Sequence, residues 1–184
     1  MAVKNSTKLV TGKTTLSYAH LITPVAPMGG GEEKYSVSVI IPKSDTVTLA
    51  KAEAAIKAAY ELGIDKFKKN GRTKALKDIH NPLRDGDIDK DGEGPYKDSM
   101  FFNCSSKQKP NIVDINCDPI MDASEIYSGI KARVSVNFYA YAVNGSYGIA
   151  AGLNNVQKLA DGTPLGGRSS AAEDFGDADD SFLD

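Results

Sequence analysis

The feature that most constrains the fold is a strict alternation of apolar and polar residues across positions 131–142. A period of two predicts a β-strand that buries one face and exposes the other. Asn144 and Gly145 follow, and this dipeptide favours a two-residue hairpin turn in which both residues have positive φ. Residues 146–153 are therefore predicted to return beside the first strand as an antiparallel partner.

The polar face of this strand has an unusual composition. It carries a cation, polar side chains and two aromatic rings: Arg133, Ser135, Asn137, Tyr139 and Tyr141. The predicted register places Gly148 opposite Tyr141 and Ala150 opposite Tyr139. Because these partners are small, we expect the neighbouring strand to leave both rings uncovered.

The remaining regular elements are predicted from similar patterns. Shorter strands are expected at residues 8–24, 34–41 and 99–105. One helix is expected to begin after the N-cap candidates Ser44 and Asp45 and to end at Gly63. Several strands with one main helix and no repeated β-α-β pattern indicate a mainly β fold, a small barrel or a sandwich with an inserted helix.

Residues 70–98 are predicted to form a long, charged and turn-rich excursion between the helix and the next strand. Loops of this length are usually functional or mobile. The excursion carries four spaced cations: Arg72, Lys74, Lys77 and Arg84. Acidic residues lie among them, so two interpretations stay open, a solvated loop or a flap that closes over a bound anionic strand.

The strand at 99–105 and the residues after it repeat the combination of ring and cation. Alternation places Phe101 on the outer face, and Lys107 and Lys109 follow. Phe101 and the two tyrosines predict a platform on which unpaired bases stack. Lys107, Lys109, Lys131 and Arg133 are predicted to hold the phosphates. The alternative is that the rings cover a second small core.

Motifs for nucleotide hydrolysis and for acid–base chemistry are incomplete. The Gly-Lys-Thr tripeptide at 12–14 lacks the first glycine of a phosphate loop, because Thr7 stands there. Neither Gly-x-Ser-x-Gly nor His-Glu-x-x-His occurs. Cys104 and Cys117 are expected to be buried thiols in a reducing compartment rather than metal ligands or a disulfide. We therefore expect no enzyme activity, no metal and no cofactor.

Two alternatives involve the acidic part of the excursion. Residues 87–98 match the opening of an EF-hand calcium loop, but Asp98 replaces the glutamate that completes it. A calcium-binding structural domain is therefore one alternative. A magnesium-dependent nuclease that uses Asp85, Asp87 and Asp89 is the other.

Charge is distributed unevenly along the chain. Residues 173–184 hold six acids and no base, which leaves 22 bases against 18 acids in residues 1–172. We predict a nucleic-acid-binding domain at 1–167 and a disordered acidic tail at 168–184. Acids and an aromatic ring in the tail are expected to dock a partner protein: Asp177, Asp179, Asp180 and Phe182.

Six stretches carry a resemblance to a known family: residues 82–87, 113–114, 127–129, 133–139, 152–158 and 161–167. In these stretches the chain resembles bacteriophage proteins long catalogued as a domain of unknown function, one of which binds single-stranded DNA through an OB-fold. The acidic tail also resembles those of phage and bacterial single-stranded DNA-binding proteins, although Leu183 and Asp184 follow Phe182 here.

The resemblance implies an OB-fold-like β-barrel, elaborated by the helix and the excursion, that acts in phage DNA replication or recombination. We expect a non-enzymatic protein that coats single-stranded DNA with little sequence preference, and whose tail docks replication or recombination proteins. The sequence leaves a homo-oligomer open. No apolar run approaches the ~20 residues that span a membrane and no secretory signal is expected, so the protein is placed in the host cytoplasm.

Overall fold

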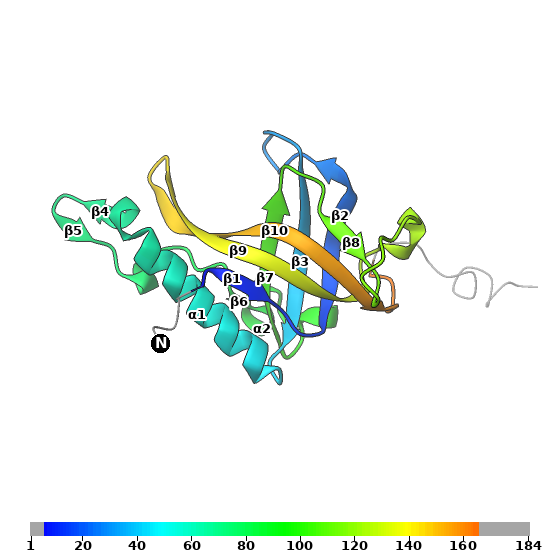
Figure 1. The fold of residues 1–184 in the computed structure, drawn as a ribbon. Helices are drawn as coiled ribbons and strands as arrows, with labels where there is room; N and C mark the ends of the chain where they lie inside the picture. The colour runs from blue at the N-terminus through cyan, green and yellow to red at the C-terminus, as the bar shows by residue number, and fades with distance from the viewer. Residues whose placement is uncertain (1–5, 166–184) are drawn as a thin grey trace, which may run out of the picture.

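The framework is a closed barrel of five strands (Figure 1). The computed structural model describes residues 6–165. The barrel strands are β2 (Thr14–Val25), β3 (Lys34–Pro42), β7 (Ser99–Ser106), β9 (Lys131–Val143) and β10 (Ser146–Ala160). They are hydrogen-bonded in the order β2-β3-β7-β10-β9, and β9 returns to β2. Only the β7–β10 pairing is parallel among these contacts. The prediction of a mainly β, OB-fold-like barrel with one main helix is confirmed.

The β9–β10 hairpin has the predicted register. Tyr141 lies opposite Gly148 and Tyr139 lies opposite Ala150. Asn144 and Gly145 both have positive φ, at 49° and 79°, as the two-residue turn requires. The return strand is longer than predicted, because it continues to Ala160 through two register shifts.

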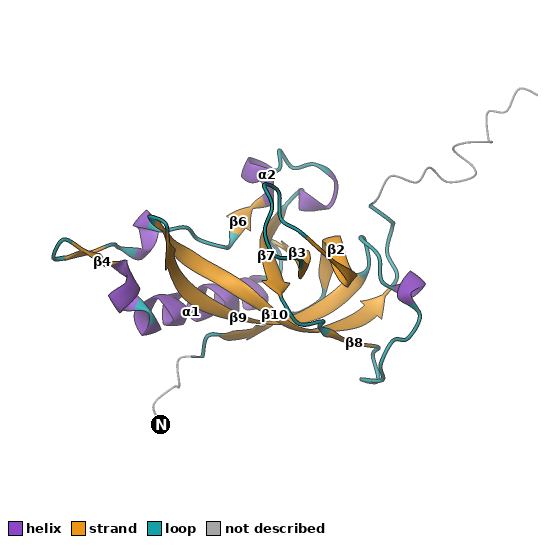
Figure 2. Ribbon diagram, turned by 90° about the horizontal axis from the view of Figure 1, so that it is seen from above, coloured by secondary structure: helices purple, strands orange, loops and turns teal. Residues whose placement is uncertain are grey.

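The helix α1 (Thr46–Leu62) also forms where predicted. The Asp45 side chain accepts a hydrogen bond from the Thr48 backbone N–H at 3.1 Å and so caps the N-terminus. Ala52, Ile56 and Ala59 are buried on one face. The helix packs against β9 and against β1 (Lys8–Val10), a short strand on the outer edge of β9. It therefore covers one side of the barrel (Figure 2).

The excursion and the residues between it and α1 form short ordered elements rather than one loop. They are η1 (Ile64–Phe67), β4 (Lys68–Lys69), β5 (Arg72–Thr73), η2 (Leu76–Asp78), β6 (Arg84–Asp85), α2 (Gly86–Asp89) and η3 (Gly94–Tyr96). β6 pairs with β7 and so adds a strand beside the barrel. Two further short elements follow β7, namely β8 (Asn111–Val113) beside β10 and η4 (Ala123–Glu125).

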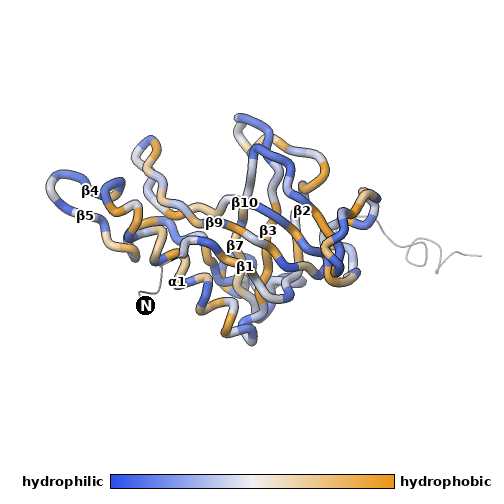
Figure 3. Tube along the Cα trace, viewed as in Figure 1, coloured by the Kyte–Doolittle hydropathy of each residue, from blue (hydrophilic) through white to orange (hydrophobic). Residues whose placement is uncertain are grey.

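The interior of the barrel holds one continuous apolar core, in which Leu16, Phe102 and Phe138 are buried. Hydropathy alternates along the barrel strands, as Figure 3 shows. Cys104 is buried as predicted, but Cys117 is exposed, because it lies in a turn with a φ of 66° outside the barrel. Within residues 6–165, no helix is long and apolar enough to cross a membrane. The tail predicted at 168–184 lies outside the described residues.

Candidate nucleic-acid interface

A groove runs across the outer face of β3 and β7. Its first part is a pocket of about 380 Å³ whose lining includes Ser36 and Asn103 together with Tyr139, Tyr141 and Arg84. The strand alternation that buries Val37 and Cys104 turns Ser36 and Asn103 outward. The predicted tyrosine face and one predicted cation of the excursion therefore meet at one site.

The groove continues through two neighbouring pockets. A pocket of about 320 Å³ shares Ser36 and Asn103 with the first one, and it adds Tyr18, His20 and Lys90. A pocket of about 530 Å³ shares these last three residues and extends past the loops that follow β8 and β10. Because adjacent pockets share lining residues, they form one continuous depression, called the barrel groove below.

Tyr139 and Tyr141 occupy one end of the barrel groove. Tyr139 is 50% exposed, and Tyr141 is half-buried. A Cβ atom at Gly148 would lie 2.7 Å from the Tyr141 hydroxyl and 2.6 Å from the Cβ of His80. Only glycine therefore allows the tyrosine and the histidine to pack so closely over β10. The prediction that small partners leave the rings uncovered therefore holds for Tyr139, whereas Tyr141 is half-buried.

The predicted role of Phe101 is wrong. Alternation does place it on the outer face of β7, but Phe101 is fully buried in a small cluster with Ile40 and Tyr96. The Tyr96 ring packs edge-on against it, with ring centroids 5.1 Å apart. The Arg84 guanidinium lies 5.2 Å from the ring centre. The excursion thus covers Phe101, so this ring supports the cations instead of stacking on a ligand.

Sequence reasoning missed Tyr18 and Lys90. Tyr18 is 61% exposed and has a φ of 47°, at a register shift between Ser17 and His20. Such a bulge re-aims a side chain relative to the regular strand. The Lys90 ammonium lies 5.6 Å from the centre of the Tyr18 ring. Alternation alone could not locate this bulge, since no glycine marks it.

The other predicted phosphate ligands lie outside these pockets. Lys131 Nζ donates to Thr15 Oγ1 at 2.6 Å, and Arg133 Nε donates to the Thr11 carbonyl at 3.1 Å. Both are therefore held near the turn between β1 and β2, at the far end of β9 from the tyrosines. Lys107 and Lys109 are exposed after β7, and Lys107 forms an ion pair with Glu32 at 2.8 Å.

Cations of the excursion separate into two groups. Arg84 lines the barrel groove, and its Nε contacts Asp89 Oδ2 at 3.0 Å. Arg72 and Lys74 line a different pocket on the β4–β5 hairpin, and Lys77 is exposed between the two places. Of the four cations predicted in the excursion, Arg84 alone lines the barrel groove.

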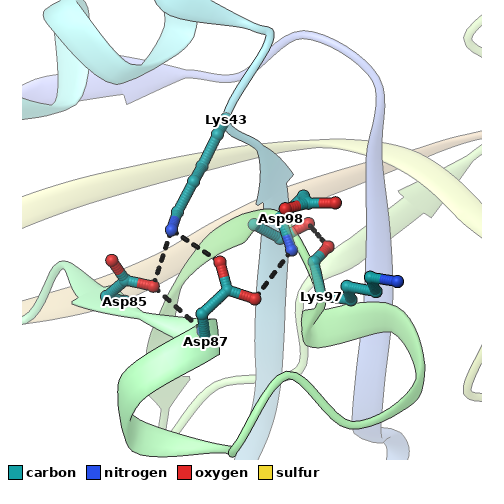
Figure 4. Close-up of polar contacts among 6 residues, drawn as sticks. Lys43, Asp85, Asp87, Lys97 and Asp98 are labelled. Atoms are coloured by element: carbon teal, nitrogen blue, oxygen red, sulfur yellow. Dashed lines mark hydrogen bonds and ion pairs between the residues drawn. The ribbon is translucent and has the colours of Figure 1, made fainter.

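Acidic residues of the predicted calcium and magnesium sites form ion pairs with basic side chains of the same protein. Lys43 Nζ lies 2.9 Å from Asp85 Oδ1 and 2.7 Å from Asp87 Oδ2, as Figure 4 shows. Asp87 Oδ1 also accepts the Asp98 backbone N–H at 3.0 Å. These bonds with Lys43 lower the pKa of both carboxyl groups and raise the pKa of Lys43.

The ammonium group of Lys43 stands where a metal ion shared by these two carboxylates would stand. Asp89, the third acid of the nuclease alternative, pairs with Arg84. Across the described ranges, no group of three or more His, Cys, Asp or Glu side chains is placed to hold a metal ion. The geometry supports an electrostatic clamp that fixes the start of α2.

The closed barrel and its groove are those of an OB-fold protein. An OB-fold protein receives oligonucleotides or oligosaccharides on the face of its second and third barrel strands, and β3 and β7 are those strands here.

A family follows from comparison with known proteins. The family described as "Enterobacter phage Enc34, ssDNA-binding protein" matches residues 7–183, and the chain belongs to this family. Protein p50 of Acyrthosiphon pisum secondary endosymbiont phage 1 is 32% identical over 177 residues, which cover 92% of this chain and 93% of that protein.

Solved structures show the same fold. The single-stranded DNA-binding protein of bacteriophage Enc34, solved in complex with single-stranded DNA, is 24% identical with a TM-score of 0.71 and covers 90% of this chain and 96% of its own. The gp2.5 single-stranded DNA-binding protein of bacteriophage T7 is 18% identical with a TM-score of 0.62, and the match covers 91% of this chain and 93% of that one.

Proposed function

We propose that this protein binds single-stranded DNA in the barrel groove with little sequence preference. The observation that carries the proposal is one continuous groove lined by tyrosine rings and cations, on the fold of a phage single-stranded DNA-binding family. Stacking needs the flat face of a base, which a duplex hides between neighbouring base pairs. The groove therefore favours unpaired strands, and every base offers a face that it can accept.

Five residues that line the groove have a role in this proposal. Tyr139, Tyr141 and Tyr18 stack on bases, and Arg84 and Lys90 neutralise phosphates. Lys107, Lys109, Lys131 and Arg133 remain proposed phosphate contacts at the two margins of the barrel, where a strand would enter or leave. No step of this function requires bond cleavage, so the protein acts by binding rather than as an enzyme.

The cellular role follows from the family. A protein that covers single strands without reading sequence serves phage DNA replication or recombination, in the cytoplasm of the host, with several copies on one strand. Family membership supports this role, and the groove supports the lack of sequence preference. Coating would shield the bases from pairing and from nucleases.

The acidic tail is proposed to regulate the groove and to dock replication or recombination proteins. Residues 173–184 carry six acids, which would occupy the cationic groove in the absence of DNA. DNA would displace them and free Asp177, Asp179, Asp180 and Phe182 for a partner protein. A chain lacking residues 173–184 should bind oligo-dT more tightly at fixed salt, and unchanged or weaker binding would argue against this regulation.

Substitution of the two groove tyrosines tests the function. Tyr139→Ala with Tyr141→Ala should weaken binding to oligo-dT, because each lost stacking contact is worth ~1–3 kcal/mol. The matched control is the double Phe variant, which keeps both rings and should bind like the wild type. Fluorescence anisotropy measures the affinity, and circular dichroism confirms that each variant is folded. A folded Ala variant with full affinity would refute the stacking role.

A further inference from the structure

The β4–β5 hairpin with Lys74, called the arm below, projects beyond the barrel on the same side as the tip of the β9–β10 hairpin (Figures 1 and 2). Asn70 and Gly71 form its turn, with φ values of 51° and 74°, which is the conformation of a tight two-residue hairpin. The tip of the arm is coloured hydrophilic in Figure 3. The arm therefore presents polar side chains to solvent on a defined backbone.

Three cations share one face of the arm. Lys69 lies directly opposite Arg72, and the Lys74 N–H donates to the Phe67 carbonyl at 2.9 Å, two pairs further along the hairpin and therefore on the same side. Directly opposite residues of an antiparallel pair lie on one face, and alternate pairs share it. Lys68 lies on the other face and forms an ion pair with Asp65.

The shared face is concave. Lys69, Arg72 and Lys74, together with Asn70 and Thr73, line a pocket of about 540 Å³. The three cations of the shared face thus border the same pocket. Guanidinium and ammonium groups in such an arrangement suit the oxygens of a phosphate.

Electrostatics also favour an anion there. Like charges directly opposite each other on a β-ladder destabilise it, and Lys69 and Arg72 are such a pair. Within residues 6–165, neither of them forms an ion pair with an acid. A bound phosphate between them would turn this repulsion into attraction.

The chain connects the arm to the barrel groove. Lys74 Nζ lies 5.2 Å from the centre of the Tyr147 ring. Further on, the His80 N–H donates to the Tyr147 carbonyl at 2.9 Å, so this part of the excursion follows the edge of β10. His80 and Arg84 then line the groove, and Lys77 is exposed between arm and groove. This segment of the chain thus links the arm to the groove, and it carries Lys77 and Arg84.

We propose that the arm is a second phosphate-binding surface, which holds the DNA strand after it leaves the barrel groove at its Tyr141 end. The proposal rests on the proposed function, and it adds to the groove a contact that only longer strands reach. It replaces the interpretation of Arg72, Lys74 and Lys77 as a flap, because these cations extend the path of the strand instead of closing over it.

The experiment compares two lengths of oligo-dT. One has about 6 nucleotides, near the lower end of the roughly 4–16 nucleotides that an OB-fold covers, and the other has about 25. Lys69→Gln with Arg72→Gln removes two arm cations and leaves Lys74 in its contact with Tyr147. The matched control is Lys51→Gln with Lys57→Gln, which removes two exposed cations from α1.

The arm variant should bind the short oligonucleotide like the wild type and the long one more weakly. Two phosphate contacts contribute about 1.4 to the salt slope at ~0.7 each. Between 50 and 200 mM salt, the wild-type affinity for the long strand should therefore fall about sevenfold more than that of the variant. The control variant should keep the wild-type slope at both lengths.

Other outcomes would overturn the proposal. An unchanged affinity and slope for the long strand would mean that the arm does not contact DNA. An equal loss at both lengths, or the same loss in the α1 control, would indicate a general effect of charge. Tighter binding by the variant would assign the arm to an acidic peptide. Failure of the wild type to bind the short strand would instead count against the groove, whatever the arm does.

Discussion

At the scale of single residues, the groove depends on a backbone irregularity at Tyr18. A non-glycine residue in the left-handed region carries strain of ~1–3 kcal/mol and persists only where the surroundings enforce it. Here the strained residue exposes 61% of its surface and has a cation beside its ring. An exposed ring in a strained conformation gains nothing for the core, so we attribute its position to ligand binding.

This attribution predicts opposite effects on binding and stability. Tyr18→Gly removes the ring and places a residue that tolerates positive φ, so affinity for oligo-dT should fall while the melting temperature stays equal or rises. Tyr18→Phe keeps the ring and should bind like the wild type. Anisotropy and thermal unfolding measure the two quantities. If Tyr18→Gly bound DNA normally, the ring would have no part in the groove.

At the scale of elements, strands and helices with a regular hydrophobic period were predictable from the sequence. The segments that pack over them were not. Alternation in residues 131–142 and the Asn144-Gly145 turn specified the β9–β10 hairpin, including its register. The capped, alanine-rich segment specified α1. The fate of Phe101 depended on Tyr96, which is distant in sequence and belongs to an excursion without a period. The exposed Tyr18 depended on a bulge, which alternation cannot reveal.

The clamp on α2 shows how one element positions the groove. Asp85 caps α2 by accepting the Asp87 N–H at 2.9 Å, and both carboxylates bind Lys43. Lys90 follows at the C-terminus of the same helix, with its N–H donating to the Gly86 carbonyl. Lys43 therefore holds the helix that brings Lys90 to Tyr18.

The clamp predicts an acid-dependent loss of stability. Lys43 lowers the pKa of Asp85 and Asp87 below the ordinary value of 3.8. A carboxylate with a lowered folded-state pKa stabilises the fold above its unfolded pKa, and this contribution disappears as pH falls through the folded value. Lys43→Gln should therefore lower the melting temperature at pH 7, and the difference from wild type should shrink below about pH 4.

The control for the clamp is Lys51→Gln, which removes an exposed cation from α1. It should leave the melting temperature near the wild-type value at both pH values. A Lys43→Gln variant that melts like this control at pH 7 would show that the ion pairs add no stability.

At the scale of the whole molecule, two parts of opposite charge are joined in one chain. Residues 1–172 carry the excess of bases, and residues 173–184 carry acids alone. This asymmetry and the tyrosine face of β9 were evident from the sequence, whereas the strand pattern left a barrel or a sandwich open and the family resemblance implied the barrel. The assembly of the groove was not, because it joins residues of β2, β3, β7, β9 and the excursion that only the closed barrel brings together.

The central claim is that the groove receives unpaired DNA by stacking and by phosphate contacts. Its most direct test is a titration of the full chain with oligo-dT and with a duplex of equal length, each at 50 and 200 mM salt. We expect tighter binding to the single strand at both salt concentrations and a log affinity that falls by about 0.7 per log unit of salt for each phosphate contact. Equal affinity for strand and duplex, or affinity for the strand that salt does not change, would contradict it.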